Sequence, residues 1–171
     1  MELASLVRDV PDFPVKGILF KDITSLINQA DAFRQVVDWM AEQYAEAEVD
    51  QVVAIEARGY IFGAPLAYQL RAGFVPVRKP GKLPTETIRE SYALEYGTNI
   101  LEMHADAIRE GQRVVVVDDL LATGGSARAA IQLVERLGGR VVGVAFMIEL
   151  DFLHGRDKLA GYDVRSLIHY S

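Results

Sequence analysis

The chain has 171 residues, half of them apolar and a quarter charged, with a formal net charge of -6. This length suits a single domain, residues 1–171, whose core needs no cross-links, and no apolar run approaches the roughly 18 residues of a membrane span. The absence of cysteine excludes disulfides, thiolate metal sites and a cysteine nucleophile and fits a reducing compartment, while the acidic balance argues against nucleic acid as a partner.

The N-terminal half predicts alternating helices and strands. Residues 1–30 are expected to be irregular, because two prolines and a glycine interrupt them. Asp31 can cap a helix whose apolar residues recur at helical spacing: Phe33, Val36, Val37, Met40 and Tyr44. The following elements are a buried strand over 52–55, a helix over 60–71 that stops at Gly73, and a strand over 74–77 that Pro76 assigns to a sheet edge or a bulge.

Residues 78–100 combine a basic loop with a β-hairpin. The loop over 78–90 shows no period and carries four basic and two acidic residues, whereas the rest of the chain carries 14 basic and 22 acidic residues. Such a loop suits a lid that closes over a polyanion, although a solvated surface loop is the plainer interpretation. Alternating apolar residues on both sides of the segment 97–99 predict the hairpin.

The C-terminal half predicts a parallel strand–helix–strand unit. Four consecutive valines over 114–117 fit a strand covered on both faces. A helix over about 126–137 and a second buried strand over 141–148 follow. The fold class is therefore α/β, with a central, mostly parallel sheet flanked by helices.

The strongest chemical signal lies where the valine strand meets its helix. Asp118 and Asp119 stand at the carboxyl end of a parallel strand, where open sheets bind ligands. Their mutual repulsion favours sugar hydroxyls or a divalent cation as partners. The next five residues offer hydroxyls, close backbone approach and a helix N-terminus, which together make a phosphate cradle: Ala122, Thr123, Gly124, Gly125 and Ser126. The acidic pair and the cradle together fit a ribose phosphate. The plainer alternative is a strand-to-helix turn with a capping serine.

Residues 114–126 resemble the phosphoribosyl-diphosphate motif of type I phosphoribosyltransferases, in the form found in the adenine-using members. Three further segments match that family in order, 11–24, 56–63 and 77–97, so the resemblance covers residues 8–150. It implies that adenine and phosphoribosyl diphosphate give AMP and diphosphate, in a cytoplasmic homodimer. Magnesium is expected to bind mainly through phosphoribosyl diphosphate, with no metal held by the protein alone. The resemblance also implies a small N-terminal base-covering segment, 1–30, and a flexible lid loop and hairpin, 78–100.

The same resemblance assigns roles to individual residues. Glu95 would be the catalytic acid and base, and Tyr96 would lie near the ribose or steady the lid. Two segments would bind diphosphate. The loop over 56–59, which often holds a strained peptide in this family, would contribute Arg58 and Gly59, and the lid would contribute Arg78, Lys79 and Lys82. The base would lie against Leu19, Phe20 and Lys21, where Lys21 replaces the usual arginine.

Simpler interpretations of several of these residues are also consistent with the sequence. Arg58 could pair with Glu56, Phe20 could be an ordinary core residue, and Glu95 could be an exposed strand residue. No histidine cluster suggests a metal site, because His104 is assigned to a polar strand face and the other two are isolated: His154 and His169. Two competing functions are transfer to a 6-oxopurine (hypoxanthine, guanine or xanthine) and nucleotide sensing without catalysis. The Ala-Thr-Gly-Gly segment favours adenine, and the acidic balance disfavours a DNA-binding regulator.

Overall fold

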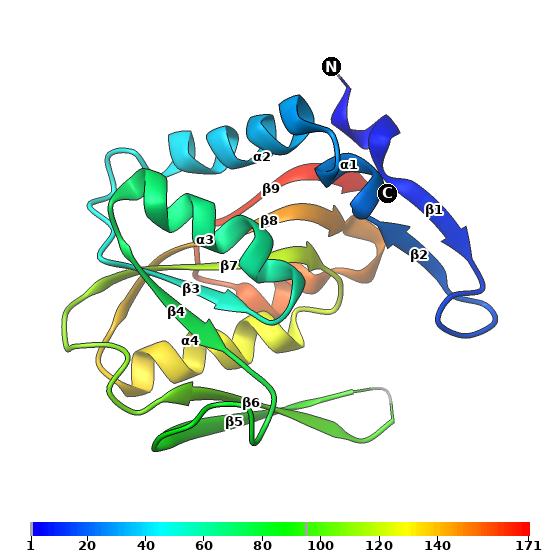
Figure 1. The fold of residues 1–171 in the computed structure, drawn as a ribbon. Coiled ribbons are helices and arrows are strands. Elements are labelled where there is room, and N and C mark those ends of the chain that lie inside the picture. The colour runs from blue at the N-terminus through cyan, green and yellow to red at the C-terminus, as the bar shows by residue number, and fades with distance from the viewer. Residues whose placement is uncertain (1, 95) are drawn as a thin grey trace.

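The protein is built around a five-stranded sheet (Figure 1); the computed structural model describes residues 2–94 and 96–171. The strand order is β4-β3-β7-β8-β9, and every neighbouring pair is parallel. In that order the strands are Gly73–Val77, Gln51–Ile55, Arg113–Leu121, Arg140–Leu150 and Val164–Tyr170. The predicted parallel α/β fold is confirmed, and β4, which contains Pro76, is an edge strand as predicted. The last strand, β9, was not predicted.

Helices cover both faces of this sheet. The helices α2 (Ala30–Gln43) and α3 (Arg58–Leu70) lie on one face, and α4 (Gly125–Arg136) lies on the other (Figure 1). The four valines of β7 are fully buried and alternate between the two cores: Val115 and Val117 pack with α2 and α3, Val114 and Val116 with α4. Successive side chains of a strand point to opposite faces, so an all-apolar run is stable only in a sheet covered twice.

Two antiparallel hairpins lie outside the central sheet (Figure 1), and only the first lies wholly at the side to which the parallel strands point. The first pairs β1 (Arg8–Pro11) with β2 (Leu19–Asp22), and the second pairs β5 (Thr87–Ala93) with β6 (Thr98–His104) below α4. Short helical turns complete the chain: η1 (Leu3–Leu6), α1 (Thr24–Ile27), η2 (Asp151–Leu153) and η3 (Gly155–Leu159). The prediction that residues 1–30 are irregular is therefore wrong, because their prolines and glycine lie at the end of β1 and in the connection to β2.

Two predicted helix ends are also wrong. The N-cap of α2 is Gln29, and Asp31 lies in the first turn, where its negative charge interacts favourably with the helix dipole. The helix α3 begins two residues before its predicted start and ends at Leu70; its C-cap is Arg71, which adopts a left-handed conformation with φ 56°. Gly73, the predicted stop, is already the first residue of β4.

The basic loop and its hairpin are shifted relative to the prediction. Because β5 begins at Thr87, the loop ends at residue 86 rather than at 90. The hairpin turn precedes Thr98, the first residue of β6, instead of lying over 97–99. Within the described residues, no helix is long and apolar enough to cross a membrane.

Candidate active site

The acidic pair lies in the last part of β7, beside the guanidinium of Arg58. Asp119 is 4% exposed and accepts a 2.6 Å hydrogen bond from Nε of Arg58. The backbone N–H of Asp119 donates to Oδ1 of Asp118 at 2.8 Å. Burial, and then the charge of Asp119, raise the pKa of Asp118 well above its usual range. The folded site therefore disfavours a second negative charge at Asp118.

The phosphate-type loop, residues 122–126, joins this strand to α4 and packs against two other segments, η3 at Gly155 and β5 at Tyr92. Gly124 has φ 89° and caps the helix. A Cβ there would lie 2.5 Å from the carbonyl oxygen of Gly155, and a Cβ on Gly125 would lie 2.9 Å from the ring of Tyr92. The glycines are thus required by packing inside the protein, a reason that the sequence alone did not reveal.

The loop over 56–59 lies directly against the acidic pair. A Cβ on Gly59 would come within 3.0 Å of both Oδ1 of Asp118 and the carbonyl oxygen of Val117, so a larger residue would displace the pair. The peptide bond between Glu56 and Ala57 is cis. The alternative pairing of Arg58 with Glu56 is wrong, because Arg58 binds Asp119 instead.

Glu56 anchors the start of the basic loop. One carboxylate oxygen of Glu56 accepts from the backbone N–H of Lys79 at 2.7 Å and from Nε of Arg78 at 3.3 Å. Arg78 also donates to the carbonyl oxygen of Lys82 at 3.3 Å, while the residues Lys79 and Lys82 themselves are exposed. Of the three predicted lid cations, Arg78 is therefore fixed by the protein and the two lysines face solvent.

Glu102 organises the rest of this loop and was missed by the sequence analysis. It is 3% exposed and accepts from the N–H of Gly81 at 2.9 Å, from Thr87 at 3.3 Å and from Arg89 at 2.6 Å. The Gly81 amide, followed by Arg89, lowers the pKa of Glu102. An acid between two apolar residues of a predicted strand, opposite a basic loop, was the available signal.

The first hairpin places an aromatic ring beside Arg58. The ring centre of Phe20 lies 5.5 Å from Cζ of Arg58, and Phe13 packs against it edge to face. Lys21 instead binds Asp9 at 2.6 Å and lies 3.9 Å over the ring of Tyr170, as expected from the alternation along β2. The neighbouring Leu19 is 53% exposed.

The remaining predicted residues differ in how far the structure describes them. Glu95 lies outside the described residues. Tyr96 is 88% exposed, Thr123 is also exposed, and Ser126 is partly buried at the start of α4. The structure thus brings Phe20, Arg58, Gly59 and the acidic pair together next to the loop 122–126.

Known proteins resemble this chain in both fold and sequence. The chain matches the family model of the phosphoribosyl transferase domain over residues 23–169. It is 58% identical to the adenine phosphoribosyltransferase of Acidobacterium capsulatum over 99% of this chain and 93% of that protein. The solved structure of the Thermoanaerobacter pseudethanolicus adenine phosphoribosyltransferase superposes with a TM-score of 0.96 at 56% identity, covering 99% and 98% of the two chains. The Saccharomyces cerevisiae enzyme, solved with adenine and an iminoaltritol bisphosphate, gives 0.91 at 42% identity, covering 97% and 96%.

The fold, the site and the match to the family model agree on the class of protein. The chain belongs to the phosphoribosyltransferase family. Its full-length relatives at 56% to 58% identity place it, within that family, among the adenine phosphoribosyltransferases.

Proposed function

We propose that this site transfers the 5-phosphoribosyl group of phosphoribosyl diphosphate to adenine, giving AMP and diphosphate. This reaction salvages a free purine and makes the protein a pentosyl-transferring glycosyltransferase. The observation that carries the proposal is the juxtaposition of the acidic pair, the loop 122–126 and Arg58 in a chain whose full-length relatives are adenine phosphoribosyltransferases. Adenine in the yeast complex supports the same base.

The loop 122–126 and the acidic pair would hold the ribose phosphate. Backbone N–H groups at the start of α4 and the hydroxyls of Thr123 and Ser126 suit a 5-phosphate, which the helix dipole also favours. The ribose hydroxyls would donate to Asp118 and Asp119, and this favours their charged forms despite the mutual repulsion. The resulting negative charge stabilises the positive charge that develops on the ribose ring as diphosphate leaves.

Diphosphate would lie between the loop 56–59 and the lid. The side chain of Arg58 is about half-exposed and uses Nε for Asp119, so its other two nitrogens would be available to diphosphate. Gly59 permits a close backbone approach, and Arg78 is held ready by Glu56. The exposed Lys79 and Lys82 would then close onto the leaving group and exclude water from the reacting sugar.

Adenine would stack on Phe20, with Leu19 beside it. Because the side chain of Lys21 is occupied by Asp9 and Tyr170, only its backbone would read the base, and the replacement of arginine then matters little for adenine. A backbone carbonyl accepts from the amino group of adenine but not from a 6-oxo group, which gives the discrimination against hypoxanthine.

Glu95 would exchange the proton of the base. The bond from N9 of adenine to C1 of the ribose forms as the bond from C1 to the diphosphate oxygen breaks, and adenine loses a ring proton. A positioned carboxylate that accepts this proton contributes a rate factor of about 100 to 10,000. Tyr96 would steady the lid beside it. Glu95→Gln should therefore lower turnover by that factor and leave AMP affinity nearly unchanged, as measured by steady-state kinetics and calorimetry; full activity would remove Glu95 from the mechanism.

Magnesium fits this donor set, because Asp118 and Asp119 offer carboxylate oxygens beside a site for phosphates. When bound, mainly through phosphoribosyl diphosphate, it would supply charge stabilisation to the leaving group. We further propose a cytoplasmic homodimer. Exposed apolar side chains in the first hairpin are compatible with a subunit contact: Phe13, Val15, Ile18 and Leu19. A monomeric mass in solution at working concentration would contradict the dimer.

The deciding experiment follows labelled adenine in the presence of phosphoribosyl diphosphate and magnesium. AMP should form, and hypoxanthine, guanine and xanthine should give only traces of product. Turnover of 6-oxopurines without turnover of adenine would reject the base assignment. Binding of both substrates with no product from any base would instead support a nucleotide sensor.

A further inference from the structure

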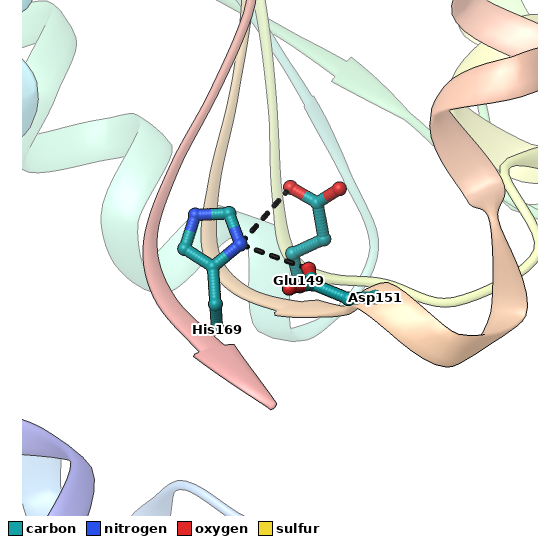
Figure 2. A group of neighbouring side chains, drawn as sticks. All are labelled: Glu149, Asp151 and His169. Carbon is teal, nitrogen blue, oxygen red and sulfur yellow. Dashed lines mark hydrogen bonds and ion pairs between the residues drawn. The ribbon is translucent and has the colours of Figure 1, made fainter. Parts of the chain in front are cut away.

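A second cluster of ionisable side chains lies outside this site, where β8 and β9 end. Glu149 is near the end of β8, Asp151 follows it, and His169 lies on β9. One ligand atom from each residue lies within 4.8 Å of the others. Figure 2 shows both carboxylates facing the same ring nitrogen of His169. The sequence-based view of His169 as an isolated residue is therefore wrong.

Glu149 has one carboxylate oxygen without a partner. Its side chain is 5% exposed, and Oε1 accepts from Nε of Arg156 at 2.7 Å. The other oxygen, Oε2, is buried without a hydrogen-bond partner among residues 2–94 and 96–171 and faces Nδ1 of His169 at 3.8 Å (Figure 2). This distance is too long for a hydrogen bond. A buried, unpartnered carboxylate oxygen indicates that a positively charged group belongs beside it.

The hydrogen bonds of His169 indicate which kind of group that is. Nε2 lies 3.2 Å from the carbonyl oxygen of Ser166, which can only accept, so Nε2 carries a hydrogen. Nδ1, the other ring nitrogen, lies 2.9 Å from Oδ1 of Asp151. An ionised carboxylate has no hydrogen to donate, so this close pair requires either a proton on Nδ1 or a cation between the two atoms. Metal-binding histidines commonly donate their other ring N–H to a carbonyl in this way.

We propose that Glu149, Asp151 and His169 bind a divalent transition metal ion, with Zn²⁺ the best fit. Imidazole with two carboxylates suits Zn²⁺ better than Mg²⁺ or Ca²⁺, which prefer oxygen ligands alone. Ligands about 2.1 Å from a tetrahedral zinc lie about 3.4 Å apart. The two separations from Nδ1, 2.9 Å and 3.8 Å, bracket that value. With Arg156 included the cluster carries a net single negative charge, which a divalent ion reverses.

The residues around the cluster leave room for a fourth ligand and show which segments the ion would connect. A cavity of about 380 Å³ adjoins the cluster, large enough for water to complete the coordination; it is also lined by His154 and Asp157. Glu149 pairs in register with Leu121, the residue before the loop 122–126, and Gly155 packs against Gly124 of that loop. The ion would therefore link the start of the connector 151–159 to strands β8 and β9, next to the phosphate-type loop, and take no part in the reaction.

The test is Zn²⁺ binding by the full chain after removal of metal with a chelator, followed by calorimetry and thermal unfolding. The native chain should bind one Zn²⁺, and its unfolding midpoint should rise. His169→Gln and Asp151→Asn should each weaken binding by about tenfold or more and abolish the rise in midpoint. Asp157→Asn, which removes the same charge from the same cavity, should change neither. Co²⁺ should give visible absorption bands in the native chain that are missing from the His169→Gln chain.

Three results would overturn the proposal. The first is the absence of Zn²⁺ binding. The second is weak binding of equal strength in the native chain and in His169→Gln, which would indicate general surface association. The third is an NMR titration showing that His169 is a stable imidazolium at neutral pH that Zn²⁺ does not displace; a proton would then hold the cluster together.

Discussion

Replacing Gly124 by alanine tests whether the phosphate-type loop is held by the connector behind it. Gly124 has φ 89°, and an added Cβ would lie 2.5 Å from the carbonyl oxygen of Gly155. The left-handed backbone costs an alanine about 1 to 2 kcal/mol. The clash is with backbone rather than with a flexible side chain, so it adds an overpacking cost of about 1 to 3 kcal/mol. We expect Gly124→Ala to lower the free energy of unfolding by about 2 to 5 kcal/mol.

A matched control separates these two effects. Gly161 has φ 92° and open space around its Cβ position, so Gly161→Ala should cost only the backbone term of about 1 to 2 kcal/mol. Urea unfolding of both variants, with unchanged m-values, gives the difference. Because the displaced loop is also the proposed phosphate cradle, Gly124→Ala should raise the KM for phosphoribosyl diphosphate and Gly161→Ala should not. Equal losses of stability in the two variants would refute the packing argument.

Three further predictions concern charge and stacking. Asp118 has a raised pKa in the folded protein, so the free energy of unfolding falls as pH rises from about 4 toward that pKa. The loss is about 1.4 kcal/mol for each unit by which the folded pKa exceeds the unfolded one. Asp118→Asn should therefore be more stable than the native chain at pH 7 by urea unfolding, while Asp119→Asn, which leaves Arg58 unpaired, should not. Glu102 has a pKa lowered from 4.5, so its contribution to the free energy of unfolding is fully present above about pH 4.5 and is lost as pH falls through the folded value. Glu102→Gln should therefore cost about 2 to 3 kcal/mol at pH 7 and progressively less in acid, and a difference that stays constant with pH would contradict this. Phe20→Leu should raise the KM for adenine about 3- to 10-fold with that for phosphoribosyl diphosphate unchanged, and an equal rise in both would argue against stacking.

Local patterns in the sequence predicted the elements that one stretch of chain can specify. Four valines predicted a doubly covered strand, and the strand–turn–helix around Gly124 predicted the loop before α4 to within one residue. Boundaries were less accurate where a cap depends on backbone conformation: the N-cap of α2 is Gln29 rather than Asp31, and the C-cap of α3 is Arg71 rather than a glycine. Left-handed conformations at non-glycine residues have only weak sequence signals.

The fold class, the order of most elements and the family motifs can be predicted from the sequence, because hydrophobic periodicity and glycine turns are properties of short segments. The partners of the charged side chains are set by contacts that form only in the folded chain. Arg58 and Asp119 are 61 residues apart in the chain, yet they form an ion pair at 2.6 Å because they follow or end the neighbouring strands β3 and β7. Such pairs depend on which strand ends the sheet brings together. For the same reason His169, isolated in the sequence, lies within a cluster of carboxylates in the folded chain.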